Sequence, residues 1–234
     1  MRTLQREHPL PWRFCTLAVC ASTERNLDDW LQAGAHPPLL VLAQHQRFGQ
    51  GQQGRIWHAP RGGVWFSAAL PWPADQRSSA SLALAATLGL ALELEGLGLS
   101  PQIKWPNDLL LSGRKVAGIL PRLRWRGQRV RFAQLGVGFN VLNRVPLGGI
   151  NLDSRLAPRR LRLEHWAARM VRALEWTAAV AKQPELVRRQ VEKRLWRPEP
   201  IEHMGHLWQV AGLTITGGLR LQRGAEVTVL HRHF

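Results

Sequence analysis

The chain reads QIKWPNDLLLSGRKVAGIL from Gln102 to Leu120, and this stretch decides the fold. Its two apolar runs flank Ser112-Gly113, a dipeptide typical of tight turns, so they predict an antiparallel hairpin. The pattern continues toward Leu142 around a second turn signal, Arg126-Gly127. We therefore expect consecutive antiparallel strands that form the core of a sheet.

The same hairpin carries the residue types of a polar site. Pro106 breaks the first arm and presents Asn107 and Asp108 at a turn, and Lys115 leaves the second arm. Together with Lys104, these residues supply a carboxylate, an amide and two ammonium groups, which suit recognition of a small anionic substrate. Taken singly, Lys104 could be a solvated strand charge and Asp108 a turn cap.

Glycines recur around this polar group. Segment 44–57 reads QHQRFGQGQQGRIW, and its glycines let backbone N–H groups approach an anion or a flat ligand closely. We expect this segment to be a loop, neither helix nor regular strand. Its GxGxxG precedes a β-like stretch rather than a helix, which excludes a dinucleotide-binding fingerprint. Gly118 and the run Gly136-Val-Gly-Phe-Asn140 suggest that a flat ligand lies against the backbone.

Periodicity and turn signals outline the remaining elements. Helices are predicted over 22–34 and 78–97, with two more over 158–195 that are interrupted near Pro184. Strands are predicted over 39–43 and 63–70. From Leu195 short β-type segments alternate with glycine turns, which predicts a small β-barrel docked on the main domain. The expected domains are 1–194 and 195–234.

Composition narrows the functional classes. The net charge of +16 could indicate a nucleic-acid binder, but the positive charges are scattered along the chain. No stretch is long and apolar enough to span a membrane, and the start lacks a secretory signal, so we expect a cytoplasmic protein. Cys15 and Cys20 lack metal-site or CxxC spacing, and we expect two buried, reduced thiols.

Several motifs together resemble the biotin–protein ligase family. They are Ser22-Thr23, the Gly49–Trp57 segment, Lys104-Trp-Pro-Asn-Asp108, Arg114-Lys-Val-Ala-Gly-Ile-Leu120 and Gly136-Val-Gly-Phe-Asn140, in the family's order and spacing. The resemblance implies an α+β fold: a class II aminoacyl-tRNA synthetase-like catalytic domain with a mixed, largely antiparallel sheet and flanking helices, followed by a small C-terminal SH3-like β-barrel.

The resemblance also implies a role for each matching residue. The residues it assigns to biotin are Ser22, Thr23, Gln46, Gly49, Gly51, Trp57, Lys115, Gly118, Gly136 and Gly138. Those it assigns to ATP or the adenylate are Gln50, Gln52, Gly54, Arg55, Trp57, Asn107 and Asn140. Those it assigns to catalysis are Lys104, Asn107, Asp108 and Lys115, with Asp108 also a ligand for Mg²⁺.

The implied activity is ATP-dependent biotinylation. The enzyme forms biotinyl-5′-AMP from biotin and ATP with Mg²⁺, then transfers biotin to a lysine of the biotin carboxyl carrier protein of acetyl-CoA carboxylase. Only about twenty residues precede Ser22, so we expect a short form without an N-terminal DNA-binding domain and without sequence-specific DNA binding. Exposed β segments are consistent with a homodimer.

Three positions depart from the family pattern. Gln50 and Gln52 stand where the family usually has arginines between the loop glycines. Retention of the adenylate is therefore expected either to be weaker or to rely on Arg47 and Arg55. Glu24 stands where the family often has asparagine and places an acid near the biotin site; a solvent-facing Glu24 would be harmless. A lipoate ligase or octanoyltransferase and a nucleic-acid-binding module are the alternatives.

Overall fold

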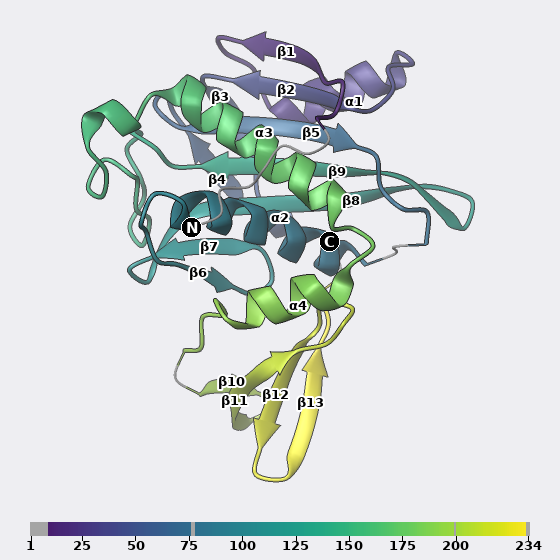
Figure 1. Ribbon diagram of the computed structural model, residues 1–234, viewed down its shortest axis with the longest axis vertical. Helices are drawn as coiled ribbons and strands as arrows, with labels where there is room; N and C mark the ends of the chain where they lie inside the picture. The colour runs from purple at the N-terminus through teal and green to yellow at the C-terminus, as the bar shows by residue number, and fades with distance from the viewer. Residues whose placement is uncertain (1–8, 76–77, 199, 233–234) are drawn as a thin grey trace.

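The computed structural model describes residues 9–75, 78–198 and 200–232. Its main feature is a seven-stranded sheet with the order β1-β2-β5-β9-β8-β7-β6 (Figure 1). The strands are β1 (Arg13–Leu17), β2 (Leu39–Ala43), β5 (Val64–Leu70), β6 (Pro101–Lys104), β7 (Asp108–Leu111), β8 (Arg114–Arg126) and β9 (Arg129–Phe139). The β1–β2 pair is parallel and the others are antiparallel, so the predicted mixed, largely antiparallel sheet is confirmed.

The two predicted turns build the centre of this sheet. Ser112 and Gly113 have positive φ angles of 49° and 72°, as a two-residue hairpin between β7 and β8 requires. Leu111 and Arg114 face each other across that turn. Gly127 at φ 58° reverses the chain between β8 and β9. The long β8–β9 hairpin therefore forms where the sequence predicts it.

Helices cover the two faces of the sheet, as expected for an α+β fold (Figure 1). The apolar helix α2 (Ser79–Glu95) packs on β8 and on α3 (Leu163–Ala179) and α4 (Pro184–Glu192). Ser78 caps α2 by accepting a hydrogen bond from the Ser81 N–H. On the other face, α1 (Thr23–Gln32) buries Leu27 against Val41 of β2. Each of the four α-helices in the described residues was predicted.

Segment 44–57 is not the loop that the sequence suggested. It contains β3 (Gln46–Gln50), a 3-10 turn η1 (Gln52–Gly54) and β4 (Ile56–Ala59), and β3 and β4 pair as a small antiparallel sheet. A Cβ at Gly49 would lie 2.5 Å from the Trp57 carbonyl oxygen, so glycine is what permits the pairing. The prediction was wrong because a strand rich in glycine and glutamine lacks the apolar alternation that marks most strands.

The C-terminal strands form a separate sheet. Strands β10 (Ile201–His203), β11 (His206–Leu213), β12 (Leu219–Arg223) and β13 (Glu226–Leu230) are antiparallel neighbours in that order. The sheet is attached to the main domain by specific bonds: the Trp105 indole donates to the Gly217 carbonyl at 2.8 Å, and the Leu213 N–H donates to Glu192 at 2.8 Å. The β character predicted for this part of the chain is confirmed.

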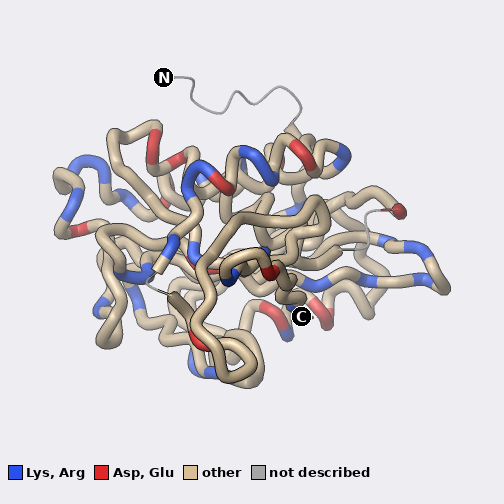
Figure 2. Tube along the Cα trace, turned by 90° about the horizontal axis from the view of Figure 1, so that it is seen from below, with Lys and Arg blue, Asp and Glu red and all other residues tan. Residues whose placement is uncertain are grey.

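The distribution of basic residues agrees with the sequence analysis, whereas the burial of the cysteines does not. Basic residues occur throughout the chain, and several arginines gather on the projecting β8–β9 hairpin (Figure 2). Cys15 and Cys20 are free thiols, as expected, but both are only partly buried rather than buried. Burial nonetheless raises the pKa of the Cys20 thiol. No described helix is long and apolar enough to cross a membrane.

Candidate active site

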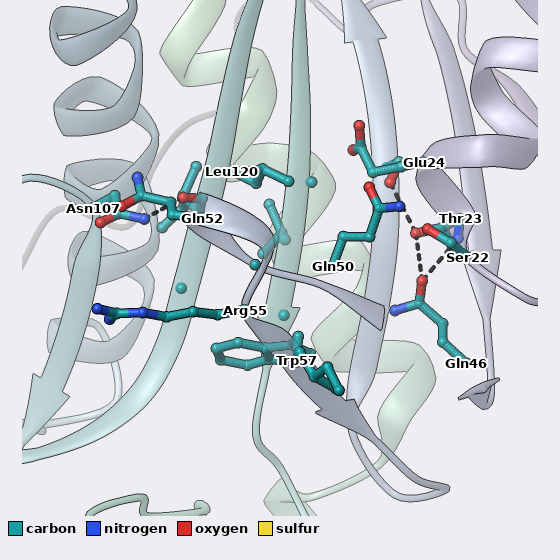
Figure 3. A pocket seen from close by; sticks show the side chains of 18 of the residues that line it. Ser22, Thr23, Glu24, Gln46, Gln50, Gln52, Arg55, Trp57, Asn107 and Leu120 are labelled. Carbon is teal, nitrogen blue, oxygen red and sulfur yellow. Dashed lines mark hydrogen bonds between the residues drawn. The ribbon is translucent and has the colours of Figure 1, made fainter. Parts of the chain in front are cut away.

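A hollow lies over the centre of the sheet, between the start of α1 and the β3–β4 hairpin. Its polar lining comes from α1, the β3–β4 hairpin and the β7–β8 hairpin, and Gly118, Gly136 and Gly138 form part of its floor. In Figure 3, Ser22, Thr23 and Glu24 lie at one end, and Gln52, Arg55 and Asn107 lie at the other. Lys115 and the glycine-rich hairpin thus face the same hollow.

The α1 end is an ordered polar wall. The Thr23 N–H and hydroxyl both donate to Gln46 Oε1, at 2.7 and 3.0 Å. Thr23 Oγ1 also lies 2.8 Å from Ser67 Oγ, and all three residues are buried. Ser22 occupies the N-cap of α1 but its side chain makes no capping bond within the described chain. Its hydroxyl therefore remains available to the hollow.

At the opposite end, Lys115 connects the two hairpins. Its Nζ lies 2.7 Å from Asp108 Oδ1 and 5.0 Å from the centre of the Trp57 ring. Both members of the ion pair are half-buried, so they remain accessible from the hollow. Asn107 is buried and donates to the Ile119 carbonyl, which fixes the turn that presents Asp108. The Lys115 ammonium group is therefore in contact with both a carboxylate and an aromatic ring.

The floor glycines are needed for close approach, but the approaching groups belong to the chain itself. A Cβ at Gly138 would lie 2.2 Å from the Trp57 indole, and one at Gly136 would lie 2.8 Å from Glu24 Oε1. A Cβ at Gly118 would lie 3.0 Å from both Trp57 and Lys115. The expectation of bare backbone beneath a flat ligand is thus corrected, because Trp57 and Glu24 already lie on these glycines.

Unpartnered polar atoms gather in this hollow. In the part of the chain that the structure describes, the buried side-chain atoms without a hydrogen-bond partner are Ser22 Oγ, Glu24 Oε1, Gln52 Nε2 and Trp57 Nε1. All four residues line the hollow. Because leaving a buried polar group unpaired costs about 1–3 kcal/mol, their concentration in one place indicates groups that are completed by a ligand.

Glu24 has an unusual environment for a carboxylate. Its side chain is only 4% exposed and does not face solvent. The negative charge of an ionised Glu24 would therefore lie next to the bound ligand. Burial raises the pKa of Glu24, whereas the neighbouring Ser67 and Arg122 lower it in part. A protonatable acid therefore forms one end of the hollow.

A neighbouring hollow takes the other predicted residues. Lys104 and Asn140 line it with Trp196 and His58, and it shares Trp57, Asp108 and Lys115 with the first. Lys104 Nζ lies 5.0 Å from the centre of the Trp196 ring. The Asn140 amide donates to the Lys115 carbonyl at 3.4 Å and so supports the strand that carries that lysine. Lys104 and Lys115 thus both line the second hollow, and of the two only Lys115 also lines the first.

Some of the predicted site residues shape the backbone instead of lining a hollow, and some residues that line the hollows were not predicted. Gly49 permits the β3–β4 pairing and Gly54 takes a turn φ of 72°, whereas Gly51 lines the first hollow. Arg55 lines that hollow too, and Arg47 is exposed outside it. Ser67 and Trp196 were missed. The single hydroxyl in the apolar strand VWFSAAL was a signal that could have identified Ser67.

Few side chains near the hollow can ligate a metal ion. Among residues 9–75, 78–198 and 200–232, no group of three or more His, Cys, Asp or Glu side chains is placed to hold an ion. Asp108 alone offers a carboxylate beside Lys115. A single carboxylate suits Mg²⁺ only when substrate phosphates supply further oxygens.

Comparison with solved structures defines the class of fold. A biotin protein ligase from Aquifex aeolicus, solved with biotin and ATP, aligns with a TM-score of 0.77 at 20% identity over 93% of this chain and 94% of that one. A biotin acetyl coenzyme A carboxylase synthetase from Helicobacter pylori, with bound biotinylated ATP, aligns with a TM-score of 0.59 at 25% identity over 92% and 98%. The fold is that of the biotin protein ligase catalytic domain.

Sequence comparison places the chain more closely. The profile of the biotin/lipoate A/B protein ligase family matches residues 16–140, more than half of the chain, and the chain belongs to this family. The bifunctional ligase/repressor BirA of Bacillus subtilis is 34% identical over 53% of this chain. The biotin–[acetyl-CoA-carboxylase] ligase of Paracoccus denitrificans is 37% identical over 51%. The chain spans 38% and 51% of the lengths of these relatives.

Proposed function

We propose that this chain is an ATP-dependent biotin–protein ligase. It forms biotinyl-5′-AMP from biotin and ATP, then transfers the biotinyl group to a lysine of an acceptor protein. The observation that carries the proposal is the hollow in which unpartnered buried polar atoms at the α1 end face the Lys115–Asp108 pair. Such a hollow suits a ligand with a polar head at one end and a carboxylate at the other.

We assign the two ends of biotin to the two ends of the hollow. Ser22, Thr23 and Gln46 bind the ureido ring, because they offer hydroxyl and amide groups on a buried wall. Lys115 binds the carboxylate and then the phosphate that is formed from it. Gly118 and Gly138 make room for Trp57, and Gly136 makes room for Glu24. The rings of biotin lie between the two ends against Trp57, with Gly49 and Gly51 shaping the hairpin beside them.

The first step joins biotin to AMP. A biotin carboxylate oxygen attacks the α-phosphorus of ATP, the bond to the bridging oxygen breaks, and pyrophosphate leaves. Lys115 neutralises negative charge as the pentavalent transition state forms, and Lys104 acts from the adjoining hollow on the leaving phosphates. Gln50, Gln52, Arg55, Asn107 and Asn140 contact the adenylate. Asp108 would hold Mg²⁺, which would supply further positive charge beside the phosphates.

The second step forms the amide. The acceptor lysine must lose a proton before its amine attacks the acyl carbon, and AMP leaves as the carbon–oxygen bond breaks. Asp108 is the carboxylate at this end of the hollow and accepts that proton, while Lys115 keeps its charge near the departing phosphate. An enzyme nucleophile is not required, because the mixed anhydride is already an activated acyl group.

The finer assignments extend this proposal. The acceptor is the biotin carboxyl carrier protein of acetyl-CoA carboxylase, which the name of the Paracoccus relative supports. The catalytic domain, 1–194, is of the class II aminoacyl-tRNA synthetase type, and 195–234 is an SH3-like barrel, supported by the antiparallel order β10–β13. The protein acts in the cytoplasm, can form a homodimer and does not recognise a DNA sequence.

The test is biotin-dependent exchange of pyrophosphate into ATP, compared for the natural chain, Lys115→Ala and Lys182→Ala. Lys115→Ala should lose most of the exchange. Lys182 is exposed in the turn between α3 and α4 and does not line either hollow, so Lys182→Ala should keep the exchange. Exchange that depends on lipoate or octanoate instead of biotin would support the alternative enzyme class. Unchanged exchange in Lys115→Ala would contradict the proposal.

A further inference from the structure

Glu24 lies at the first turn of α1 and lines one end of the hollow (Figure 3). One oxygen, Oε2, accepts a hydrogen bond from Gln134 Nε2 at 3.0 Å and lies 3.7 Å from an Arg122 nitrogen. The other oxygen, Oε1, is buried and has no hydrogen-bond partner among residues 9–75, 78–198 and 200–232. The carboxyl group is thus half-satisfied by the protein.

The charged neighbours do not complete Oε1. Asp28, one turn along α1, takes a short ion pair from Arg124 and shares the Gln134 amide. Arg122 from β8 lies 3.8 Å from Asp28 and 3.7 Å from Glu24, so its charge is divided between the two acids. These contacts go to Asp28 and to Glu24 Oε2, not to Oε1.

The nearby hydroxyls are committed elsewhere. Thr23 donates its hydroxyl proton to Gln46 Oε1, since that oxygen also accepts the Thr23 N–H and must be the carbonyl of the amide. In the Thr23–Ser67 contact of 2.8 Å, Ser67 is therefore the donor. The Ser67 hydroxyl lies close enough to lower the pKa of Glu24, but it makes no hydrogen bond of ordinary geometry with Oε1. Oε1 is thus left open to a donor from a ligand.

We propose that Glu24 Oε1 is a specificity-determining acceptor, which binds an N–H group of the cyclic urea head of the ligand. The proposal rests on the proposed function, in which that head occupies the α1 end of the hollow. Gly136 supports it, because a Cβ there would lie 2.8 Å from Oε1 and would take the space into which the oxygen projects. An ionised acceptor distinguishes this pocket from one lined by an amide, since it favours a cationic head group.

That difference provides a sharp test. The cyclic guanidine analogue of biotin, 2-iminobiotin, has the same shape but is a cation at neutral pH. Binding of biotin and of 2-iminobiotin is measured by calorimetry on the natural chain and on Glu24→Gln, which keeps an acceptor oxygen and loses the charge. The ratio of guanidine to urea affinity should fall roughly 10- to 100-fold in Glu24→Gln, the range for a hydrogen bond to a charged group.

Two more variants keep the test decisive. Asp29→Asn removes a charge from an exposed position of the same helix that does not line the hollow, so the affinity ratio should be unchanged. Gly136→Ala should shift the ratio in the direction of Glu24→Gln, and it serves if Glu24→Gln does not fold. An unchanged ratio in both Glu24→Gln and Gly136→Ala would overturn the inference. A natural chain that binds neither ligand would instead overturn the proposed function.

Discussion

The contact between Gly138 and Trp57 makes a quantitative prediction about activity. In Gly138→Ala the new Cβ would lie 2.2 Å from the indole, whereas non-bonded carbon atoms approach to about 3.5 Å, so the ring must move by roughly 1.3 Å. The movement takes Trp57 away from its place 5.0 Å from Lys115 Nζ. Because a misplacement of about 1 Å can cost about 100-fold in rate, we expect adenylate formation to fall by that order.

The assay is a double-mutant cycle. Pyrophosphate exchange is measured for the natural chain, Gly138→Ala, Trp57→Ala and the double variant, with thermal unfolding as the control for folding. If the alanine acts only by displacing the indole, it has little further effect once Trp57 is already alanine. Overpacking alone should destabilise Gly138→Ala by about 1–3 kcal/mol. An equal loss of activity in both backgrounds would refute the reasoning.

Three further predictions concern other contacts. Gln52 lines the hollow with its amide nitrogen unpaired, so Gln52→Arg should release less biotinyl-AMP than the natural chain without acceptor, and equal release would count against it. Burial raises the pKa of Glu24 above 4.5, so the stability that Glu24 contributes is full below pH 4.5 and is lost as pH rises through the raised value. Denaturant titrations should therefore show that Glu24→Gln gains stability relative to the natural chain as pH rises. A stability difference that does not depend on pH would contradict this prediction. Glu192 accepts from the Leu213 N–H at 2.8 Å and pairs with Arg188, so Glu192→Ala should destabilise the chain by about 1–3 kcal/mol, measured by thermal unfolding against the exposed Glu164→Ala, and an equal midpoint in both variants would exclude the role.

Local signals predicted most of the fold. The Ser112-Gly113 and Arg126-Gly127 turns, the apolar strands and the capped helix after Ser78 are each specified by residues close together in the sequence. The β3–β4 hairpin was not predicted, because its pairing depends on Gly49 fitting against the Trp57 backbone. Only the folded arrangement reveals that contact, since apolar alternation is absent from the segment.

The candidate site was likewise predicted only in part. The hairpin turn placed Asp108 and Lys115 in contact, as the spacing predicts, because both flank one two-residue reversal. Lys104 ends the preceding strand β6 and lines the adjoining hollow with Trp196, which follows α4 far along the chain. Sequence spacing predicts which residues share a hairpin, but it does not determine the hollow that each one lines.

Glu24 shows what the helical pattern contained and the sequence interpretation did not use. Glu24, Leu27 and Leu31 are spaced as one face of α1, and Leu27 is fully buried on that face. A glutamate at the first position of an apolar face is therefore expected to point inward, not to solvent. Periodicity gives that direction, but it cannot reveal that Gln134 and Arg122, more than ninety residues away in the sequence, serve one oxygen and leave the other free. The unsatisfied oxygen is a property of the assembled sheet, and it is the feature on which ligand selection at this end of the hollow depends.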